Sequence, residues 1–492
     1  MNDVLGRILE LLRYDQSQPM LFNTGLFFVL FVVFLLIYQN LHRWQTIKKL
    51  FVIAFSLYFY YKSSSWCVVI LCFVCVCDYL LGLWLGCTEN RLMRRFIVAL
   101  NVVANVAMLS YFKYFNLLID AINGLFNFSY NFVDIILPAG ISFFTFRSIS
   151  YIVDIYRRTL APCKSLLDYT FFLTFFPPLL AGPVVRAKDM LGQIKENKPP
   201  TSAMFSEGIF LIMCGLVKKV VIADYISGNF VDRIFDNPAL YTGFENLLGA
   251  IGFTIQLYCD FSGYSDMAIG LALVLGYRFK ENFSSPFKSQ NPTEFWRRWH
   301  ISLSTWLRDY IYIPLGGNRR GRIRAYFNQF VTMVIGGLWH GASWMYIIWG
   351  VYHGLLLVLH KIMHRLWRLP TFLQDTIVIR VSNMAFTFLL IVFGFILFRA
   401  SSLETVGVML YQIVSDFHIS VAPQFFAGYT LIVALMIFAF IAHMLPHSVT
   451  LKFEKVYASL PAVLQGIVVA IVIFFVIQMR QSEIVPFIYL QY

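Results

Sequence analysis

The chain has 492 residues, of which 59% are hydrophobic and 13% are charged, whereas about 25% of the residues of a soluble domain are charged. This composition excludes a soluble globular protein and indicates an integral membrane protein. A net charge of +13 would suit a nucleic-acid partner, but the basic residues lie mostly between apolar runs and follow the positive-inside rule, so we expect no nucleic acid. The main basic groups are Lys48-Lys49, Arg94-Arg95, Arg157-Arg158, Lys218-Lys219 and residues 319–324.

Apolar runs recur from residue 21 to the C-terminus. A helix of about 20 residues crosses a hydrocarbon layer about 30 Å thick, and on that basis we predict an all-α polytopic membrane protein with about eleven transmembrane helices. We expect one membrane-embedded domain over residues 1–492. Runs too short to cross alone are expected to be re-entrant or half-length. The runs cover residues 21–38, 50–61, 66–85, 96–112, 135–155, 169–183, 210–223, 247–275, 327–339, 342–360, 381–398, 430–444 and 464–477.

Eight cysteines raise the question of a metal site, because CFVCVC (72–77) contains a CxxC spacing. Its neighbours are apolar and no second pair follows at ligand spacing. Buried cysteine used as a small hydrophobic residue is the better interpretation.

Two carboxylates interrupt the apolar stretch QLYCDFSGYSDMAIG (256–270). Asp260 and Asp266 are six residues apart, so on a helix they point about 120° away from each other. They do not form a paired-carboxylate site, and each needs a partner of its own, such as Arg, Ser or Tyr. The alternative is that they support or line a polar passage.

The segment NPTEFWRRWHISLSTW (291–306) predicts one amphipathic helix at the boundary of water and lipid. Asn291 can cap it, and the carboxylate of Glu294 can fold back on the exposed N–H groups. His300 is either a half-exposed interfacial histidine or a functional one. The apolar stripe consists of Trp296, Trp299, Leu303, Trp306 and Tyr310.

The loop PLGGNRRGRIRAY (314–326) carries Arg319, Arg320 and Arg322. These arginines are either ordinary cytoplasmic charge or contacts to the phosphates of a nucleotide-derived donor, because guanidinium groups match phosphate oxygens. The Gly-Gly in this loop is too general to count as a phosphate motif.

His340 lies in GGLWHGASW (336–344), near the middle of an apolar stretch, with glycines that let the helix break. An ionisable group at membrane depth costs several kcal/mol, so it is expected to face a cavity or a partner. The alternative is a structural histidine bonded to a carbonyl group. A neutral imidazole can take a proton from a hydroxyl and return it to a leaving group, which favours general-base chemistry.

His353, His360 and His364 fall near one face of the following helix. A metal or haem site is conceivable there, but the segment is where a span leaves the membrane, and basic and aromatic residues gather at such places.

Several long motifs in order along the chain resemble the membrane-bound O-acyltransferase superfamily, and most closely its alginate O-acetyltransferase branch. The resemblance covers most of the chain from about residue 21 and is weakest between residues 370 and 460. One departure is Pro178, where we expect a polar residue. The motifs are LPAGISFFTFRSISYIVDIYR (137–157), FFPPLLAGPVVR (175–186), GLVKKVVIAD (215–224), YCDFSGYSDMAIG (258–270), WRRWHISLSTWLRDYIYIPLGGNRRG (296–321), GGLWHGASW and the terminal PFIYLQY.

The resemblance implies a helical bundle around a central funnel or tunnel, with a catalytic histidine that matches His340. A second family position, a His or Asn about forty residues earlier, matches His300. Asp260, Asp266, Trp339 and Ser304 are then expected to line or support the passage.

We therefore expect an acyltransferase that O-acetylates an exported, alginate-like polysaccharide, in the cytoplasmic (inner) membrane of a bacterium. The donor would be a cytoplasmic thioester, acetyl-CoA or an acyl-carrier protein, used as co-substrate with no bound cofactor or metal. His340 would be the general base, and His300 would orient the donor or stabilise the oxyanion. The acceptor would be the polysaccharide or a relay, with an extracytoplasmic acetyltransferase as partner protein. A transporter with a proton-relay histidine is the alternative, and a non-catalytic export scaffold is a weaker one.

Overall fold

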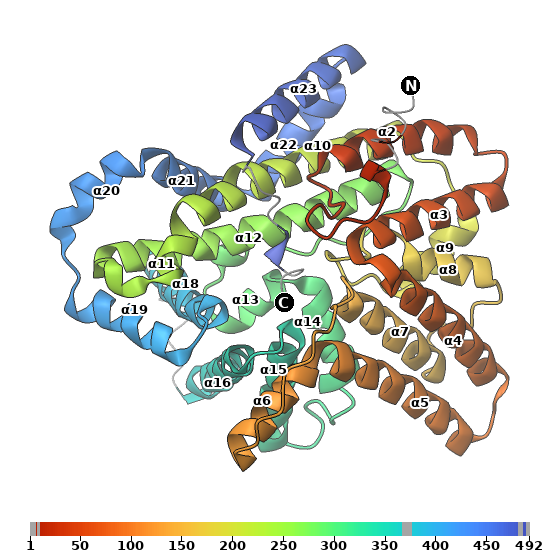
Figure 1. Cartoon of the computed structure of the whole chain (residues 1–492), viewed down its shortest axis with the longest axis horizontal. Coiled ribbons are helices and arrows are strands. Elements are labelled where there is room, and N and C mark those ends of the chain that lie inside the picture. The colour runs from red at the N-terminus through yellow and green to blue at the C-terminus, as the bar shows by residue number, and fades with distance from the viewer. Residues whose placement is uncertain (1–5, 7–9, 367–375, 481–485, 489–492) are drawn as a thin grey trace. The chain divides into compact units, whose positions relative to one another are not determined.

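The computed structural model describes residue 6 and residues 10–366, 376–480 and 486–488. Every regular element among these residues is a helix (Figure 1). The chain divides into two compact units, one comprising Met1–Ile209 and Met267–Lys280 and the other Phe210–Asp266 and Glu281–Leu490. The boundary falls inside two helices, α10 and α12, so the two units share continuous backbone.

The first unit is built from the N-terminal helices. Its elements are α2 (Gly25–Asn40), α3 (Gln45–Ser64), η1 (Ser65–Cys67), α4 (Val68–Cys87), α5 (Arg91–Leu109), η2 (Ser110–Tyr114), α6 (Phe115–Phe126), α7 (Ile141–Tyr156), α8 (Leu166–Thr174), α9 (Ala187–Glu196) and the start of α10 (Ser202–Leu216).

The segment after α8 is irregular and buried, so the apolar run 169–183 does not form one continuous helix. Pro177 and Pro178 cannot continue a helix because they lack the N–H group. Two backbone carbonyl groups of this segment accept hydrogen bonds from the Arg147 side chain instead of from a helix. Its Nη1 donates to Leu173 O at 3.3 Å, and its Nη2 donates to Pro178 O. Protein therefore covers this backbone and satisfies it, as a membrane interior requires.

The second unit holds the rest of the chain. Its elements are η3 (Val217–Asp224), η4 (Ser227–Val231), α11 (Asp232–Asp236), η5 (Pro238–Leu240), α12 (Gly243–Val274), η6 (Pro286–Lys288), α13 (Pro292–Arg298), α14 (Ile301–Leu307), η7 (Arg308–Tyr312), α15 (Arg322–His340), α16 (Trp344–Leu366), α18 (Ile377–Arg399), α19 (Leu403–Ser415), η8 (Ile419–Val421), α20 (Ala422–Gly428), α21 (Thr430–Met444), α22 (His447–Ser459) and α23 (Ala462–Met479).

Lys218 and Lys219 lie inside the helical stretch formed by α10, η3, η4 and α11, where η3 and η4 are π-helical. The expectation that this pair belongs to a charged loop is wrong. Lys219 is fully buried, and it forms ion pairs with Asp260 of α12 and with Asp224 of η3 itself. Counting charges along the sequence could not separate this pair from cytoplasmic loop charge.

The predicted break in GGLWHGASW is confirmed, since α15 ends at His340 and α16 begins at Trp344. The two helices pack closely through glycine. A Cβ atom on Gly350 would lie 2.7 Å from the carbonyl oxygen of Met333, and one on Gly337 would overlap the carbonyl oxygen of Tyr346. Small residues at such positions let two helix backbones approach, which apolar helices in lipid use to associate.

The predicted single helix over 291–306 is wrong at its centre. α13 ends at Arg298, and His300 has a left-handed backbone (φ 42°) before α14 begins. The N–H groups of Ile301 and Ser302 donate to the backbone and side-chain oxygens of Asn282, at 2.9 and 3.2 Å. A neighbouring segment thus takes hydrogen bonds that a continuous helix would use itself. The predicted cap is confirmed, because Asn291 accepts from Glu294 N at 2.8 Å and the Glu294 carboxylate accepts from Gln290 N at 2.9 Å.

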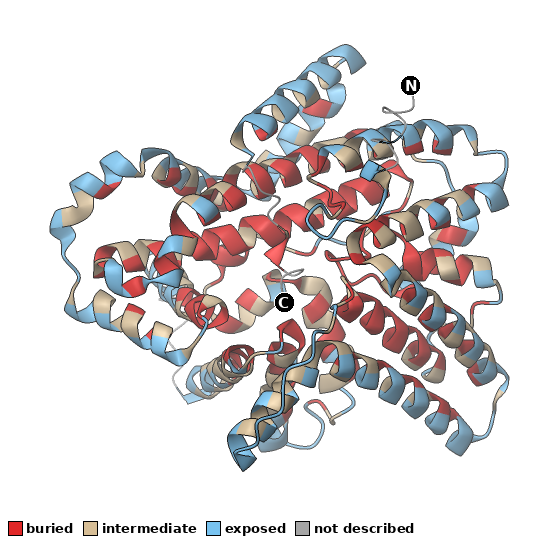
Figure 2. Cartoon of the chain, viewed as in Figure 1, coloured by how far each residue is buried: buried red, intermediate tan, exposed pale blue. Residues whose placement is uncertain are grey.

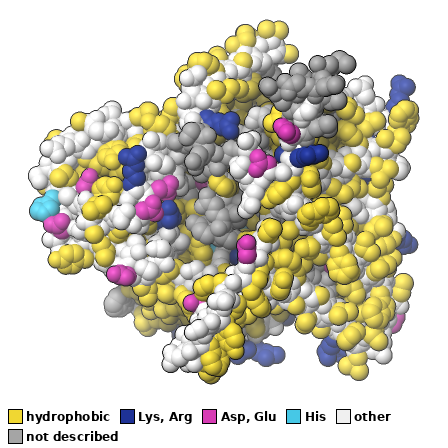
Figure 3. Space-filling view, in the orientation of Figure 1, with side chains coloured by type: hydrophobic (Ala, Val, Ile, Leu, Met, Phe, Trp, Pro, Cys, Tyr) yellow, Lys and Arg dark blue, Asp and Glu magenta, His cyan; other side chains and the backbone are white. Residues whose placement is uncertain are grey.

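Within the described residues, five helices are long and apolar enough to cross a membrane, or up to seven if each bent pair forms one span. The bent pairs turn by 89° (α19 with η8 and α20) and 98° (α21 with α22). Burial varies widely among the helices: α7 and α12 are mostly buried and α23 is mostly exposed (Figure 2). Hydrophobic side chains cover most of the face seen in Figure 3, with few charges among them. These features make the chain a membrane protein.

We predict that Gly350→Ala lowers the stability of the second unit by about 1–3 kcal/mol, the usual cost of forcing extra atoms into a packed contact. The new methyl group would meet the backbone of α15, which cannot rotate away as a side chain can. The measurement is thermal unfolding of the purified protein in detergent. Gly466→Ala in α23 is the control, because nothing lies within 4 Å of a Cβ atom there. Equal melting temperatures for both variants would contradict the close contact.

Candidate functional site

His300 and His340 both lie near the indole ring of Trp339 in the second unit. The ring centroids of His300 and Trp339 are 6.1 Å apart, and those of Trp339 and His340 are 5.0 Å apart. Both histidines are buried, with 0% and 5% of their surface exposed. The half-exposed interfacial interpretation of His300 is therefore wrong, and the structure brings the two sequence-predicted histidines into one cluster.

His340 is the last residue of α15 and is surrounded by aromatic rings. The centroids of Trp349 and Phe398 lie 4.9 and 5.3 Å from the imidazole centroid, with ring planes close to perpendicular. Gly341 has an extended backbone, so the chain leaves the helix directly after the histidine. The imidazole is thus held at a helix end by packing, which restricts its rotation.

Asn282 positions His300. Its Oδ1 accepts from Ser302 N at 3.2 Å and from Ser302 Oγ at 2.8 Å, and it lies 3.2 Å from His300 Nδ1. The backbone N–H of Ser302 can only donate, so the Asn282 atom that it meets is the amide oxygen and not the amide nitrogen. An amide oxygen can only accept, and Nδ1 of the neutral His300 ring therefore carries the hydrogen. Nε2 is then the acceptor nitrogen of His300.

Burial lowers the pKa of the His300 imidazole to about 3. The ring lies 4.6 Å from Phe261, centroid to centroid. An apolar setting disfavours the charged form of an imidazole. His300 is therefore neutral at physiological pH, with a lone pair on Nε2.

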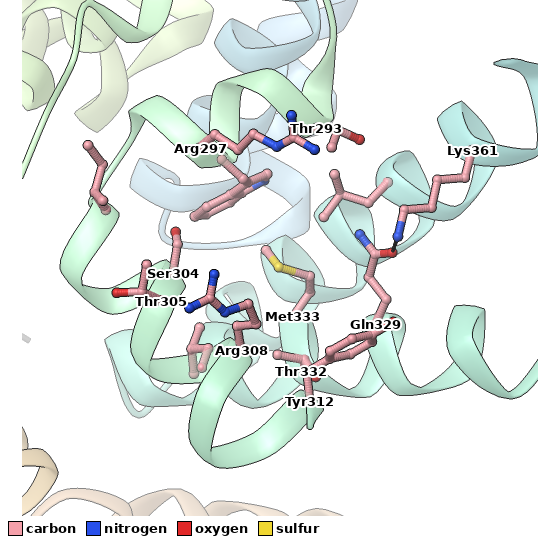
Figure 4. A pocket seen from close by; sticks show the side chains of 14 residues that line it. Thr293, Arg297, Ser304, Thr305, Arg308, Tyr312, Gln329, Thr332, Met333 and Lys361 are labelled. Atoms are coloured by element: carbon pink, nitrogen blue, oxygen red, sulfur yellow. Dashed lines mark hydrogen bonds between the residues drawn. The ribbon is translucent and has the colours of Figure 1, made fainter. Parts of the chain in front are cut away.

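A cavity of about 430 Å³ lies among the helices that flank the two histidines in the chain (Figure 4), and its lining includes neither histidine nor Trp339. Helices α13, α14, η7, α15 and α16 supply its walls, and all of them belong to the second unit. Its cations are Arg297, Arg308 and Lys361, and Lys361 donates to Gln329. Apolar and hydroxyl side chains, including Trp296, Met333, Thr332, Ser304 and Thr305, form the remaining wall.

The cavity follows one face of α15 towards His340. Gln329, Thr332 and Met333 line it, and Gly336 and His340 continue the same helical face at spacings of three, four and seven residues. On the opposite wall, Ser304 lies four residues after His300 and its hydroxyl donates to the Trp299 carbonyl group at 3.3 Å. The cavity wall and the two histidines are therefore connected through α14 and α15.

Arg319, Arg320 and Arg322 are exposed and do not line the cavity. Their loop starts directly after Tyr312, which does line it, and is held against α15 by the hydrogen bond from Asn328 Nδ2 to Gly317 O at 3.0 Å. The cavity cations Arg297, Arg308 and Lys361 are functional candidates that the sequence did not single out. The one sequence feature that sets Arg297 and Arg308 apart is that they lie off the apolar stripe of residues 296–310.

Asp260 and Asp266 are ion-paired with the two adjacent lysines of η3. Lys219 lies 2.6 Å from Asp260 and 2.7 Å from Asp224, and Lys218 lies 2.6 Å from Asp266. Neighbouring residues on a helix differ by about 100°, close to the 120° between the two aspartates, which explains how both pairs form at once. Lysine was not among the partners that we expected.

The Lys219 cluster also holds the C-terminal segment. Ile488 N donates to Asp260 Oδ2 at 3.0 Å, and Lys219 Nζ donates to Pro486 O at 3.3 Å and lies 4.6 Å from the centre of the Phe487 ring. Three residues of the terminal motif PFIYLQY are therefore anchored inside the second unit. Residues 489–492 of that motif lie outside the described residues.

Over the described part of the chain, no three His, Cys, Asp or Glu side chains are grouped so as to hold a metal ion. His360 instead meets Thr293, with 3.0 Å between its Nδ1 and the threonine hydroxyl. The cluster of two histidines suits proton transfer to and from a hydroxyl, and the cationic cavity suits the binding of a phosphorylated molecule.

Comparison with known proteins identifies the class of this membrane protein. Residues 163–403 match the membrane-bound O-acyltransferase family. The chain is 43% identical over 401 residues to the probable alginate O-acetylase AlgI of Pseudomonas putida, with 79% of each chain covered. It is 35% identical to the peptidoglycan O-acetyltransferase of Helicobacter pylori, over 82% of this chain and 80% of that one.

The chain therefore belongs to the membrane-bound O-acyltransferase family and is an O-acyltransferase, similar within the family to alginate O-acetylases. A more distant relative is the teichoic acid D-alanyltransferase of Bacillus subtilis, 29% identical over 53% of this chain and 68% of that one. The expected family and enzyme class are confirmed.

We predict that Lys219→Met lowers the free energy of unfolding by about 3–5 kcal/mol, because it leaves buried carboxylates without their cation. Asp260→Asn should cost less, since Lys219 keeps Asp224 as a partner. Denaturation in detergent measures both. Lys198→Met is the control: its ion pair with Glu196 is exposed (76% and 59%), and such pairs contribute about 0–1 kcal/mol. A stable Lys219→Met variant would contradict the structural role of the cluster.

Proposed function

We propose that this protein transfers an acetyl group from a cytoplasmic thioester to a hydroxyl acceptor, for the O-acetylation of an exported polysaccharide. The observation that carries the proposal is that two buried histidines contact Trp339, next in the chain to helices that line a cavity with three cations. The similarity to alginate and peptidoglycan O-acetylating proteins supports acetyl as the acyl group and a polysaccharide as the acceptor.

His340 acts as the general base in this proposal. Its neutral imidazole takes the proton from the acceptor hydroxyl as the oxygen attacks the thioester carbonyl carbon. The tetrahedral intermediate then collapses, the C–S bond breaks, and the leaving thiolate takes the proton back from His340. The packing of Trp339, Trp349 and Phe398 around the ring keeps it oriented through both proton transfers.

His300 orients a substrate. In the tautomer fixed by Asn282, its Nε2 can accept a hydrogen bond, which suits an amide or hydroxyl group of a substrate. Stabilising an oxyanion, the other role considered for this residue, would require a protonated ring, and burial opposes that. Trp339 lies near both imidazoles, and Ser304 supports the His300 side of the cavity.

The cavity binds the donor. Acetyl-CoA and an acyl-carrier protein both present a thioester on a phosphopantetheine arm, so both offer a phosphate to Arg297, Arg308 and Lys361. The exposed Arg319, Arg320 and Arg322 attract the same negative charge from a greater distance, an effect that salt screens. Asp260 and Asp266 support the site through the η3 lysines.

The acceptor reaches the site from the opposite side of the membrane. Such access requires a central passage, which the family resemblance implies. The apolar runs of spanning length predict about eleven crossings around it. We place the protein in the bacterial inner membrane, with the donor in the cytoplasm. The polysaccharide, or a relay to an extracytoplasmic acetyltransferase partner, receives the acetyl group.

We predict that His340→Ala lowers kcat for acetyl transfer by at least about 100-fold, the smallest usual contribution of a general base. The measurement uses the purified protein, radiolabelled acetyl-CoA and a soluble hydroxyl acceptor. His364→Ala is the control, because this exposed histidine lies on α16 outside the cluster. A His340→Ala protein that is folded and retains more than a few percent of the activity would remove the assigned role, and a wild-type protein with no transfer or thioester hydrolysis would favour a transporter.

We also predict that Arg297→Ala and Arg308→Ala each raise KM for the donor about tenfold with kcat nearly unchanged, because they remove binding that is equal in the ground and transition states. Arg319→Ala should have a smaller effect that disappears at high salt. Arg95→Ala in the first unit is the control. If only the loop variants raise KM, the donor phosphates bind at the loop and not in the cavity.

A further inference from the structure

Asp78 is a buried carboxylate in the first unit that the proposed reaction does not use. It lies on α4, inside a stretch long and apolar enough to span a membrane, and 1% of its surface is exposed. No lysine, arginine or histidine in the described ranges forms an ion pair with it. An ionised group at membrane depth without an opposite charge is costly and marks a functional site by default.

Three side chains from three other helices converge on this carboxylate as donors. Asn101 Nδ2 and Ser148 Oγ donate to Asp78 Oδ1 at 2.8 and 2.7 Å, and the Tyr169 hydroxyl donates to Oδ2 at 2.9 Å. A protonated carboxyl group would need an acceptor for its own hydrogen, whereas these three groups all donate in the observed arrangement. The arrangement therefore fits the ionised carboxylate.

Two amide oxygens beside the carboxylate have no hydrogen-bond partner among the described residues. They are Oδ1 of Asn101 and Oδ1 of Asn105, on residues that are 2% and 5% exposed. The amide nitrogens of both residues donate to the same Ser148 hydroxyl, at 3.2 and 2.9 Å. Each oxygen belongs to the same amide group as a nitrogen that bonds Ser148, so both amide groups lie next to the hydroxyl that donates to Asp78.

We propose that Asp78 and the amide oxygens of Asn101 and Asn105 bind a sodium ion. Carboxylate and amide oxygens are hard ligands that suit alkali and alkaline-earth cations. A single carboxylate balances a single positive charge, which selects a monovalent ion over calcium or magnesium. The ion neutralises Asp78, occupies the two unpartnered oxygens, and ties α4 to α5.

Thermal unfolding of the full-length protein in detergent tests the site. Sodium chloride should raise the melting temperature by about 3–5 °C over N-methylglucamine chloride at the same ionic strength and pH, with saturation, because the ion binds the folded state. Asp78→Asn should abolish the response. Asp266→Asn, which alters a different, half-buried carboxylate paired with Lys218, should keep it.

Asn105→Leu keeps the proposal testable if Asp78→Asn does not fold, because Asn105 does not contact the carboxylate itself. It should move the midpoint of the sodium titration to at least about tenfold higher concentration by removing one ligand. Unchanged midpoints in this variant, or no difference between the two salts in the wild type, would overturn the proposal.

A pH titration without sodium distinguishes a bound ion from a bound proton. The ionisable side chains that interact with Asp78 are Cys75, Cys77, Tyr151 and Tyr169. Cysteine and tyrosine are both neutral at pH 7 in their ordinary state. Stabilisation that appears on lowering the pH from 8 to 6 and makes sodium ineffective would mean that Asp78 binds a proton instead, and would overturn the sodium site.

Discussion

The close approach of α15 and α16 is the constraint on which the histidine cluster depends. Gly350 brings the α16 backbone so near to Met333 that a methyl group at this position would lie 2.7 Å from its carbonyl oxygen. At this separation Trp349, the residue before Gly350, reaches the imidazole at the end of α15. Gly350 therefore acts through the distance between the two backbones. The surroundings of His340 depend on that distance.

A second common feature is that polar groups inside this apolar protein have specific partners from distant segments. Lys219 neutralises two carboxylates and holds the C-terminal segment, and Asn282 fixes both the break before α14 and the tautomer of His300. Asp78 accepts hydrogen bonds but forms no ion pair with a basic side chain among the described residues. Because an unpaired charge is so costly at this depth, each of these groups marks a place where structure or function requires it.

Local sequence information predicted the features that have local causes. The Asn291 cap began α13, and glycine marked the end of α15 after His340. It failed where a distant segment decides the outcome. The α13–α14 break depends on Asn282, which competes for backbone hydrogen bonds, and the η3 lysines resemble loop charge until the carboxylates of α12, about forty residues away, are placed beside them. The cavity cations come from three different helices and share no sequence pattern.

The most direct test of the central claim is a cryo-electron microscopy structure with a non-hydrolysable thioether analogue of acetyl-CoA. The account predicts density in the cavity, with phosphate groups at Arg297, Arg308 and Lys361 and the acetyl carbonyl group beside Trp339, where a hydroxyl could also reach His340. Analogue density elsewhere, with the acetyl group separated from His340 by the protein interior, would contradict it.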